Sequence, residues 1–398
     1  MTREEIYSKS WNFINKNPIL LLESVPGTGK TKISIDLVNA LIDTKYQGKK
    51  TSMLLLVAKN MHKITWAKEF EKWGGIKVDT IVVECYESLC KHVGETFDFV
   101  VLDEVHHIKS EKRSKELESL HFSYMIGLSG TIPKKLKQYM KFRYNSWIVS
   151  CDIVEAIEDE ILPEPKILLL PLELDNKNLT ETWEINPKAK GPLIEADIKD
   201  FWKYKKMKRH AIFKCTPRRK LIEYDALIAW RKNMFMTNRS DIMKNMWLHL
   251  CGERLEFLAN SKNPIVLQIL HKLKNQRTIT FCKTIEQAET LGSNCIHSKN
   301  KDAVETYNRF NERKIKHITA VNILNENANL VDCKYAVFAN LSSSEIIVPQ
   351  RIGRSLRHPS PVIIVPYYKG TREEEIVAKI FADYDKRFIK HIKSIDEI

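Results

Sequence analysis

The sequence has no long hydrophobic stretch: none of its apolar runs reaches the roughly 18 residues that a membrane-spanning helix requires. The first five residues, Met1 to Glu5, include two acidic side chains and lead into no apolar segment, so we expect no signal peptide. These absences predict a protein of the cytoplasm, or of the host cytoplasm if the chain is viral, that does not act in a membrane.

Closely spaced cysteine pairs are also missing. The eight cysteines stand singly, and no two of them form a Cys-x-x-Cys pair. Disulfide frameworks and zinc sites depend on such pairs, so the pattern argues against both and suits reduced thiols.

Acidic residues are fewer than basic ones. Fifty Asp and Glu stand against 64 Lys and Arg, which gives a formal net charge of +14 and a pI of about 9.2. A surface with this excess attracts polyanions. A generally lysine-rich composition would give the same excess, so the charge alone does not name the ligand.

Two stretches of the chain alternate short apolar strands with helical patterns. Continuous apolar strands separated by helices predict parallel sheets covered on both faces, so we expect two α/β domains with a cleft between them. The segment 159–165 contains two prolines and few apolar residues, and we place the joint there, with domains at 1–162 and 163–398. The expected strands are Ile19–Leu22, Ser52–Val57, Thr80–Val83, Phe97–Leu102, Met125–Ser129, Ile167–Leu170, Thr278–Phe281, Ile318–Val321, Tyr335–Ala339 and Val362–Pro366.

Residues 176–250 interrupt this alternation. Strand-like runs disappear while basic and aromatic residues crowd together, which predicts a mostly helical insertion in the second domain. The insertion is either an additional nucleic-acid contact, with bases stacked on its rings, or an ordinary helical layer with buried aromatics and solvated lysines. Beyond it, the last helical pattern runs from Glu373 to Lys393.

A glycine-containing turn follows the first expected strand and precedes a helical pattern from Ile33 to Leu41. In such a loop, backbone N–H groups wrap the phosphates of a nucleotide, Lys30 reaches the β and γ oxygens, and the Thr31 hydroxyl holds Mg²⁺. The strict pattern has glycine where this chain has Ser24, a position that begins the loop and accepts a small residue. The expected nucleotide contacts are Pro26, Gly27, Thr28, Gly29, Lys30 and Thr31.

Asp103-Glu104-Val105-His106 lies at the carboxyl end of the strand Phe97–Leu102. In an open parallel sheet, ligands bind beyond the carboxyl ends of the strands, so this tetrad is expected beside the phosphate loop. There Asp103 would hold Mg²⁺ through water, and Glu104 would orient or deprotonate the attacking water.

These motifs, followed by Leu128-Ser129-Gly130-Thr131 and Gln350-Arg351-Ile352-Gly353-Arg354-Ser355-Leu356-Arg357, resemble those of superfamily 2 helicases of the DExH type. The resemblance covers residues from about 19 to 370 and implies two tandem RecA-like domains with ATP in the cleft between them. It also implies that Arg354 and Arg357, one helical turn apart, reach the γ-phosphate as catalytic fingers, and that Gln350 contacts a phosphate.

Further segments resemble other motifs of the family. Leu324–Leu330 is similar to motif V, with Asn327 in the place of a glycine, and Arg254–Leu258 is similar to the UvsW-type DNA helicases of phages. In the family such segments touch the nucleic-acid backbone or couple it to the ATP site; Trp66 and Trp73, in the segment similar to motif Ia, are alternatively core residues. The resemblance assigns coupling to His106, Ser129, Thr131 and Glu326, and nucleic-acid contact to Lys59, Tyr86, Ser88 and Asn329, to which the basic insertion adds Lys205, Lys206 and Arg209.

The resemblance implies a monomeric motor that uses ATP and Mg²⁺ to move on, unwind or remodel duplex or branched DNA. No glutamine precedes residue 47, so the chain lacks the upstream glutamine with which many helicases read adenine, and ATP is the default nucleotide. Two alternatives stay open: an RNA helicase with the same motor, and a non-unwinding protein that binds or anneals nucleic acid. The second alternative requires a broken catalytic set, whereas Lys30, Asp103, Glu104, Arg354 and Arg357 are all present.

Overall fold

The computed structural model describes residues 1–321, 330–341, 352, 358–382 and 384–398. Its first sheet has six parallel strands in the order β3-β2-β4-β5-β1-β6. The strands are β1 (Ile19–Ser24), β2 (Ser52–Val57), β3 (Thr80–Cys85), β4 (Thr96–Asp103), β5 (His121–Ser129) and β6 (Trp147–Cys151).

Both faces of this sheet are buried, which explains why its strands are continuously apolar. Leu20 and Leu22 of β1 face one core, while Leu21 faces the other, because successive strand side chains point to opposite faces. The first core includes side chains of α1 (Arg3–Ile14), α2 (Lys30–Lys45) and α3 (Asn60–Lys72). The second includes side chains of the 3₁₀ helices η1 (Tyr86–His92) and η2 (Val105–Lys109), and of α4 (Glu111–Glu118) and α5 (Lys134–Tyr144).

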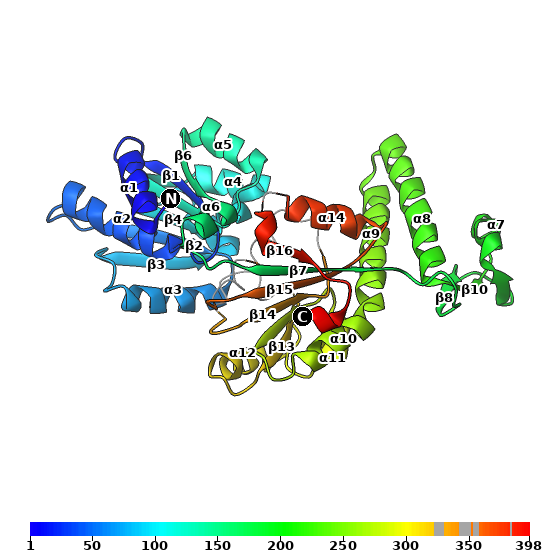
Figure 1. Cartoon of the computed structure of the whole chain (residues 1–398). Helices are drawn as coiled ribbons and strands as arrows, with labels where there is room; N and C mark the ends of the chain where they lie inside the picture. The colour runs from blue at the N-terminus through cyan, green and yellow to red at the C-terminus, as the bar shows by residue number, and fades with distance from the viewer. Residues whose placement is uncertain (322–329, 342–351, 353–357, 383) are drawn as a thin grey trace.

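The second sheet has seven parallel strands in the order β12-β13-β11-β14-β15-β7-β16. Figure 1 shows it beside the first domain, with α6 (Ile153–Glu158) leading into β7. The strands are β7 (Lys166–Leu172), β11 (Thr278–Phe281), β12 (Cys295–Ile296), β13 (His317–Ala320), β14 (Tyr335–Phe338), β15 (Val362–Tyr368) and β16 (Ile389–His391), and the helices that pack on them are α10 (Asn263–Lys272), α11 (Ile285–Leu291), α12 (Ala303–Asn311) and α14 (Arg372–Ile380).

The two-domain parallel α/β architecture predicted from the sequence is confirmed, and each expected strand corresponds to an observed one. The helical pattern expected from Glu373 to Lys393 is wrong in its second half. Helix α14 ends at Ile380, and β16 then adds a strand beside β7. A three-residue strand has too few residues to establish an alternating pattern, so only its pairing partner identifies it. The domain boundary at 162/163 stays a prediction.

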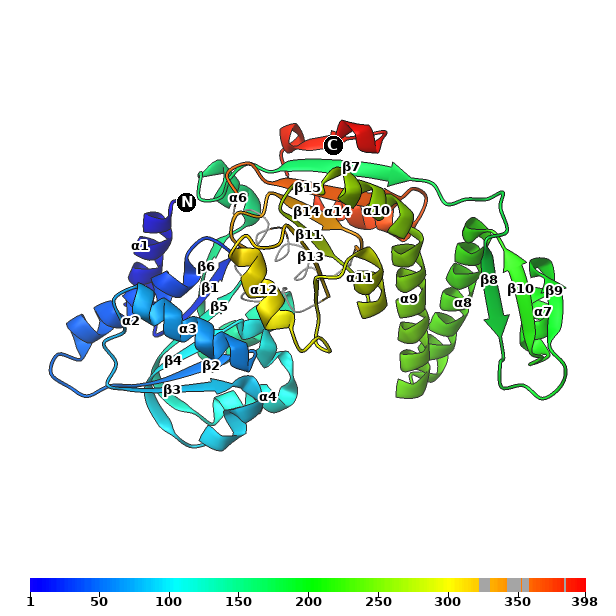
Figure 2. The ribbon, with the colours of Figure 1, turned by 90° about the horizontal axis from the view of Figure 1, so that it is seen from below.

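The insertion contains strands that the sequence reading did not foresee. Strands β8 (Glu181–Ile185), β9 (Ile194–Asp197) and β10 (Ala211–Cys215) form a three-stranded sheet, covered by α7 (Phe201–Lys206). Two long helices, α8 (Pro217–Asn238) and α9 (Asp241–Ser261), lie side by side and separate this sheet from the second domain (Figure 2). The predicted absence of strands was wrong because these strands are short and interrupted by charged residues, while the helical majority was right. Even α8 and α9 lack the apolar character that a bilayer crossing needs, as does every other helix in the described part of the chain.

A buried ion pair fixes the base of this helical arm to the second domain. Lys262, at the end of α9, is 0% exposed and its Nζ lies 2.5 Å from Oε1 of Glu373, which is 2% exposed. The other carboxylate oxygen of Glu373 accepts a hydrogen bond from the backbone N–H of Tyr368 at 3.1 Å. Both oxygens of the buried carboxylate therefore have a partner, as the burial of a charge requires.

Removing one partner of this pair should leave an uncompensated buried charge. We expect Glu373→Gln and Lys262→Met each to lower the free energy of unfolding by about 3–5 kcal/mol. The double variant should lose much less than the sum of the two. Denaturant unfolding of the four proteins measures this, and additive losses would show that the two side chains act independently.

Candidate active site

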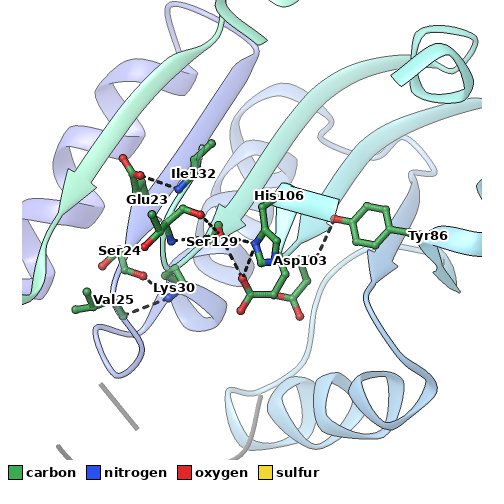
Figure 3. Close-up of polar contacts among 11 residues, drawn as sticks. Glu23, Ser24, Val25, Lys30, Tyr86, Asp103, His106, Ser129 and Ile132 are labelled. Atoms are coloured by element: carbon green, nitrogen blue, oxygen red, sulfur yellow. Dashed lines mark hydrogen bonds and ion pairs between the residues drawn. The ribbon is translucent and has the colours of Figure 1, made fainter. Parts of the chain in front are cut away.

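Three neighbouring strands bring the site together. In the order β4-β5-β1, Asp103 at the end of β4 is in register with Leu128, and Glu23 of β1 with Ser129. The phosphate loop, the Asp-Glu pair and Ser129 therefore meet at the carboxyl edge of the first sheet, where Figure 3 shows their side chains. This is the edge at which ligands of open α/β sheets bind.

In the loop from Ser24 to Lys30, glycine stands only at the two positions with a positive φ. Gly27 has φ 106° and Gly29 has φ 93°, values that side-chain-bearing residues rarely adopt. Ser24 is the last residue of β1, does not have a positive φ, and is 1% exposed; its hydroxyl donates to that of Thr28. The departure from the strict phosphate-loop pattern is therefore accommodated.

Lys30 is the first residue of α2 and turns back over the loop. Its Nζ donates to the carbonyl oxygen of Ser24 and, at 3.2 Å, to that of Val25. Thr31 follows it in the first turn of the helix, where backbone N–H groups and the helix dipole favour an anion.

Asp103 is held by two aromatic side chains. The indole Nε1 of Trp66 on α3 donates to Asp103 Oδ2 at 2.9 Å, and the hydroxyl of Tyr86 donates to the Asp103 carbonyl oxygen at 2.9 Å. Sequence reasoning missed both contacts: it left Trp66 as a motif or core residue, and it assigned Tyr86 to nucleic acid. Because Tyr86 is only 1% exposed, its side chain offers little surface to a nucleic acid in this structure.

Glu104 belongs to a buried polar network with two of the predicted coupling residues. Its Oε2 accepts from the Ser129 hydroxyl at 3.2 Å and lies 3.4 Å from His106 Nδ1, which is itself 3.0 Å from the Ser129 hydroxyl. Glu104 has φ 55° and ψ 57°, a left-handed conformation that carries a cost for a residue with a side chain. Strain held by surrounding contacts is typical of functional sites.

The turn after β5 is fixed to the phosphate-loop strand. The backbone N–H of Thr131 donates to Ser129 Oγ at 3.3 Å, and the backbone N–H of Ile132 donates to Glu23 Oε1 at 2.8 Å. Lys137 of α5 pairs with the other oxygen of Glu23 at 2.5 Å. A movement at Thr131 is thereby linked to the strand that carries the phosphate loop.

Five of the predicted site residues lie outside the described part of the chain: Gln350, Arg354, Arg357, Glu326 and Asn329. Two residues that adjoin them are described. Ile352 and Leu330 are both 0% exposed and belong to the core between the second sheet and its helices.

The expected nucleic-acid contacts fall in two separate places. Lys59 is exposed immediately before α3, and Ser88 is half-buried in η1, both on the first domain. The strands β8, β9 and β10 and the helix α7 form a small lobe at the far end of the insertion (Figure 2). This lobe contains Lys205, Lys206 and Arg209. The structure thus does not bring the two groups together.

The side chains at the sheet edge fit a magnesium–triphosphate complex. The amine of Lys30 and the backbone N–H groups of the first turn of α2 suit phosphate oxygens, while the carboxylate of Asp103 and the hydroxyl of Thr31 are hard oxygen ligands of the kind Mg²⁺ prefers. No cluster of three or more His, Cys, Asp or Glu able to hold a metal by itself occurs among the described residues. The metal would accordingly be shared with the nucleotide.

The fold and this edge define a phosphate-loop NTP hydrolase built from two tandem RecA-like domains. Residues 2–134 match the family model of the type III restriction enzyme res subunit, and residues 261–359 match that of the helicase conserved C-terminal domain. Each model covers a part of the chain, so the chain is similar to a restriction-enzyme subunit family in its first segment and to a helicase family in its second.

Two proteins resemble it in sequence. A protein described as DNA 3'-5' translocase XPB2, from Sulfurisphaera tokodaii, is 22% identical over 94% of this chain and 81% of its own length. A probable helicase, D10 of Escherichia phage T5, is 30% identical over 29% of this chain and 27% of its own length.

Two solved structures share the fold. Dbp5 of S. cerevisiae, bound to RNA and ADP BeF3, has a TM-score of 0.60 at 13% identity and is matched over 99% of this chain and 91% of its own. The type ISP restriction-modification enzyme LlaBIII, bound to DNA, has a TM-score of 0.58 at 13% identity, over 99% of this chain and 31% of its own. At these identities the likeness establishes the architecture alone.

Replacing Lys30 by alanine should reduce ATP turnover by at least roughly 100-fold, because the ammonium neutralises charge that develops on the transferred phosphoryl group. Steady-state phosphate release measures the effect. Lys32→Ala is the matched control, since Lys32 lies two residues further along α2, is exposed and pairs with Asp36. Equal turnover in the two variants would contradict the assignment of the phosphate loop.

Proposed function

We propose that this protein is a DNA translocase and helicase of the DExH type, in which ATP hydrolysis moves the chain along duplex or branched DNA. The observation that carries the proposal is the assembly at one sheet edge of Lys30 and Asp103 (Figure 3) and of Glu104, which is hydrogen-bonded to Ser129. Likeness over 94% of the chain to a protein described as a DNA 3'-5' translocase supports the choice of DNA. The Asp103-Glu104-Val105-His106 tetrad supports the DExH subtype.

In this proposal the first domain supplies three chemical roles. Lys30 neutralises the β and γ phosphates, and Thr31 and Asp103 hold Mg²⁺, which shields the phosphate charge. Glu104 orients the attacking water and accepts its proton. The hydrogen bond from Ser129 and the proximity of His106 hold the Glu104 carboxylate, so they set the direction in which it meets the water.

The second domain completes the site. We assign Arg354 and Arg357 to the γ-phosphate and Gln350 to a phosphate contact, with Glu326 and Asn329 in the segment that links the nucleic acid to the ATP site. Binding of ATP then favours closure of the two domains, and hydrolysis removes the charge that both domains hold. A monomer is sufficient for this cycle, because both halves of the site belong to one chain.

The nucleic acid is held through its backbone. Lys59 and Ser88 offer contacts on the first domain, and the insertion supplies further charge: residues 176–261 contain 18 Lys and Arg against 10 Asp and Glu. Lys206 and Arg209 are exposed at the end of the arm. Such contacts bind without reading sequence.

The aromatic residues around β8, β9, β10 and α7 are packed in a core, which argues against the base stacking of the first reading but leaves its basic contacts in place. Phe201 and Phe213 are 0% exposed, and Trp183, Trp202 and Tyr204 pack against them as the core of the small lobe. Stacking of bases on these rings is therefore dropped from the proposal. Lys205 is half-buried as well, and its burial, followed by the nearby charge of Arg231, lowers its pKa.

The alternative substrate is RNA, and comparison of nucleic acids distinguishes the two. We expect ATP turnover to rise at least roughly fivefold with duplex, forked or four-way DNA, and less with RNA of the same length and shape. Phosphate release with each nucleic acid at equal phosphate concentration measures this. Stronger stimulation by RNA would replace DNA with RNA as the substrate, and no stimulation by either would reject the motor.

Binding should be strongly salt-dependent if it depends on backbone phosphates. We expect the affinity for a DNA fork to fall by about 10³-fold or more between roughly 50 and 200 mM salt. Fluorescence anisotropy of a labelled fork measures this affinity. Replacing both Lys206 and Arg209 by alanine should reduce the slope of log affinity against log salt by about one unit or more. Lys301→Ala is the control, since Lys301 is an exposed lysine outside the insertion. An unchanged slope in the double variant would remove the insertion from the proposed interface.

A further inference from the structure

The two hydrogen bonds that hold Asp103 are both buried. Trp66 is 3% exposed, Tyr86 is 1% exposed and Asp103 is 6% exposed. Because water does not compete in such a place, removal of a donor leaves an acceptor unsatisfied, and that loss is larger than the net gain from an ordinary exposed hydrogen bond. The orientation of Asp103 therefore depends on the positions of both aromatic side chains.

The two donors come from the segments that follow β2 and β3. Trp66 lies in α3, the helix that begins directly after the exposed Lys59. Tyr86 is the first residue of η1, which also contains Ser88. The proposed function places Lys59 and Ser88 on the nucleic-acid backbone. A shift of α3 or η1 on binding a strand must then move a group that holds Asp103.

We propose that Trp66 and Tyr86 are positioning residues that transmit nucleic-acid binding to the carboxylate of Asp103. The indole N–H fixes one carboxylate oxygen and the tyrosine hydroxyl fixes the backbone of the same residue. Outer hydrogen bonds of this kind orient metal ligands and tune metal affinity. The part concerning nucleic acid rests on the proposed function, whereas the part concerning Mg²⁺ rests on the two hydrogen bonds.

A purely structural role for these rings is the competing explanation. Trp66 packs against Phe70 with ring centroids 5.5 Å apart, and Tyr86 stacks on His107 at 5.5 Å. Phenylalanine at either position keeps an aromatic ring but removes the hydrogen-bond donor. Substitution by phenylalanine therefore separates positioning from packing.

The first experiment measures Mg²⁺ binding without turnover. A fluorescent ATP analogue is bound to the protein and Mg²⁺ is titrated into it. In Trp66→Phe, the Mg²⁺ concentration for half-saturation should rise about 10–100-fold, while binding of the analogue in EDTA stays unchanged. Trp73→Phe is the matched control at the end of the same helix, because the Trp73 indole donates to Glu69 at an exposed position. Wild-type Mg²⁺ dependence in a folded Trp66→Phe protein would overturn the proposal.

The second experiment measures transmission. At saturating Mg²⁺, the ratio of ATP turnover with a DNA fork to turnover without it should fall at least roughly fivefold in Trp66→Phe and in Tyr86→Phe, but not in Trp73→Phe. An unchanged ratio would reject the link to nucleic acid. If wild-type turnover shows no response to DNA, the proposed function fails, whereas the Mg²⁺ titration still decides the positioning role. Should Trp66→Phe fail to fold, Tyr86→Phe supplies both tests through the other donor.

Discussion

The pairing of β5 with both β4 and β1 is the constraint on which the site depends. Parallel strands in register end at the same edge of the sheet, so the residues that follow these strands lie next to one another along that edge. Lys30, Asp103 and Ser129 come from segments far apart in the sequence, and this pairing brings the segments together at one edge of the first sheet. Strand order, more than any loop, therefore determines what chemistry the first domain can perform.

Burial of the polar side chains at this edge then fixes their orientations. Asp103, Glu104, His106 and Ser129 are each at most 6% exposed, and polar groups in such surroundings must find partners within the protein. The partners come from the neighbouring motifs, so each motif restrains another: Ser129 restrains Glu104, and Trp66 restrains Asp103. Because each of these side chains depends on its neighbour, the network permits few other arrangements of the four residues. A site that switches between two defined states requires such restraint.

The helical arm, formed by α8 and α9, is attached to the second domain at one end only. The second domain fixes it at its base through the buried pair of Lys262 and Glu373, while the small lobe at its other end has a separate core around Phe201 and Phe213. The lobe is held apart from the ATP site and carries much of the excess positive charge. In the proposed function its contribution is binding surface, and α8 and α9 are the elements that connect it to the second domain.

Much of this protein was determined by its sequence alone. Two parallel sheets followed from continuous apolar strands alternating with helices, and the phosphate loop and the Asp103–His106 tetrad followed from residue types with few other uses at such spacings. Tertiary structure decided what local patterns do not record: that Ser24 ends a strand and needs no glycine, that Tyr86 is buried under Asp103, that β16 pairs with β7, and that the insertion contains a sheet. Each of these depends on a partner distant along the chain, and burial or pairing with a distant partner leaves no periodic trace in the neighbouring residues.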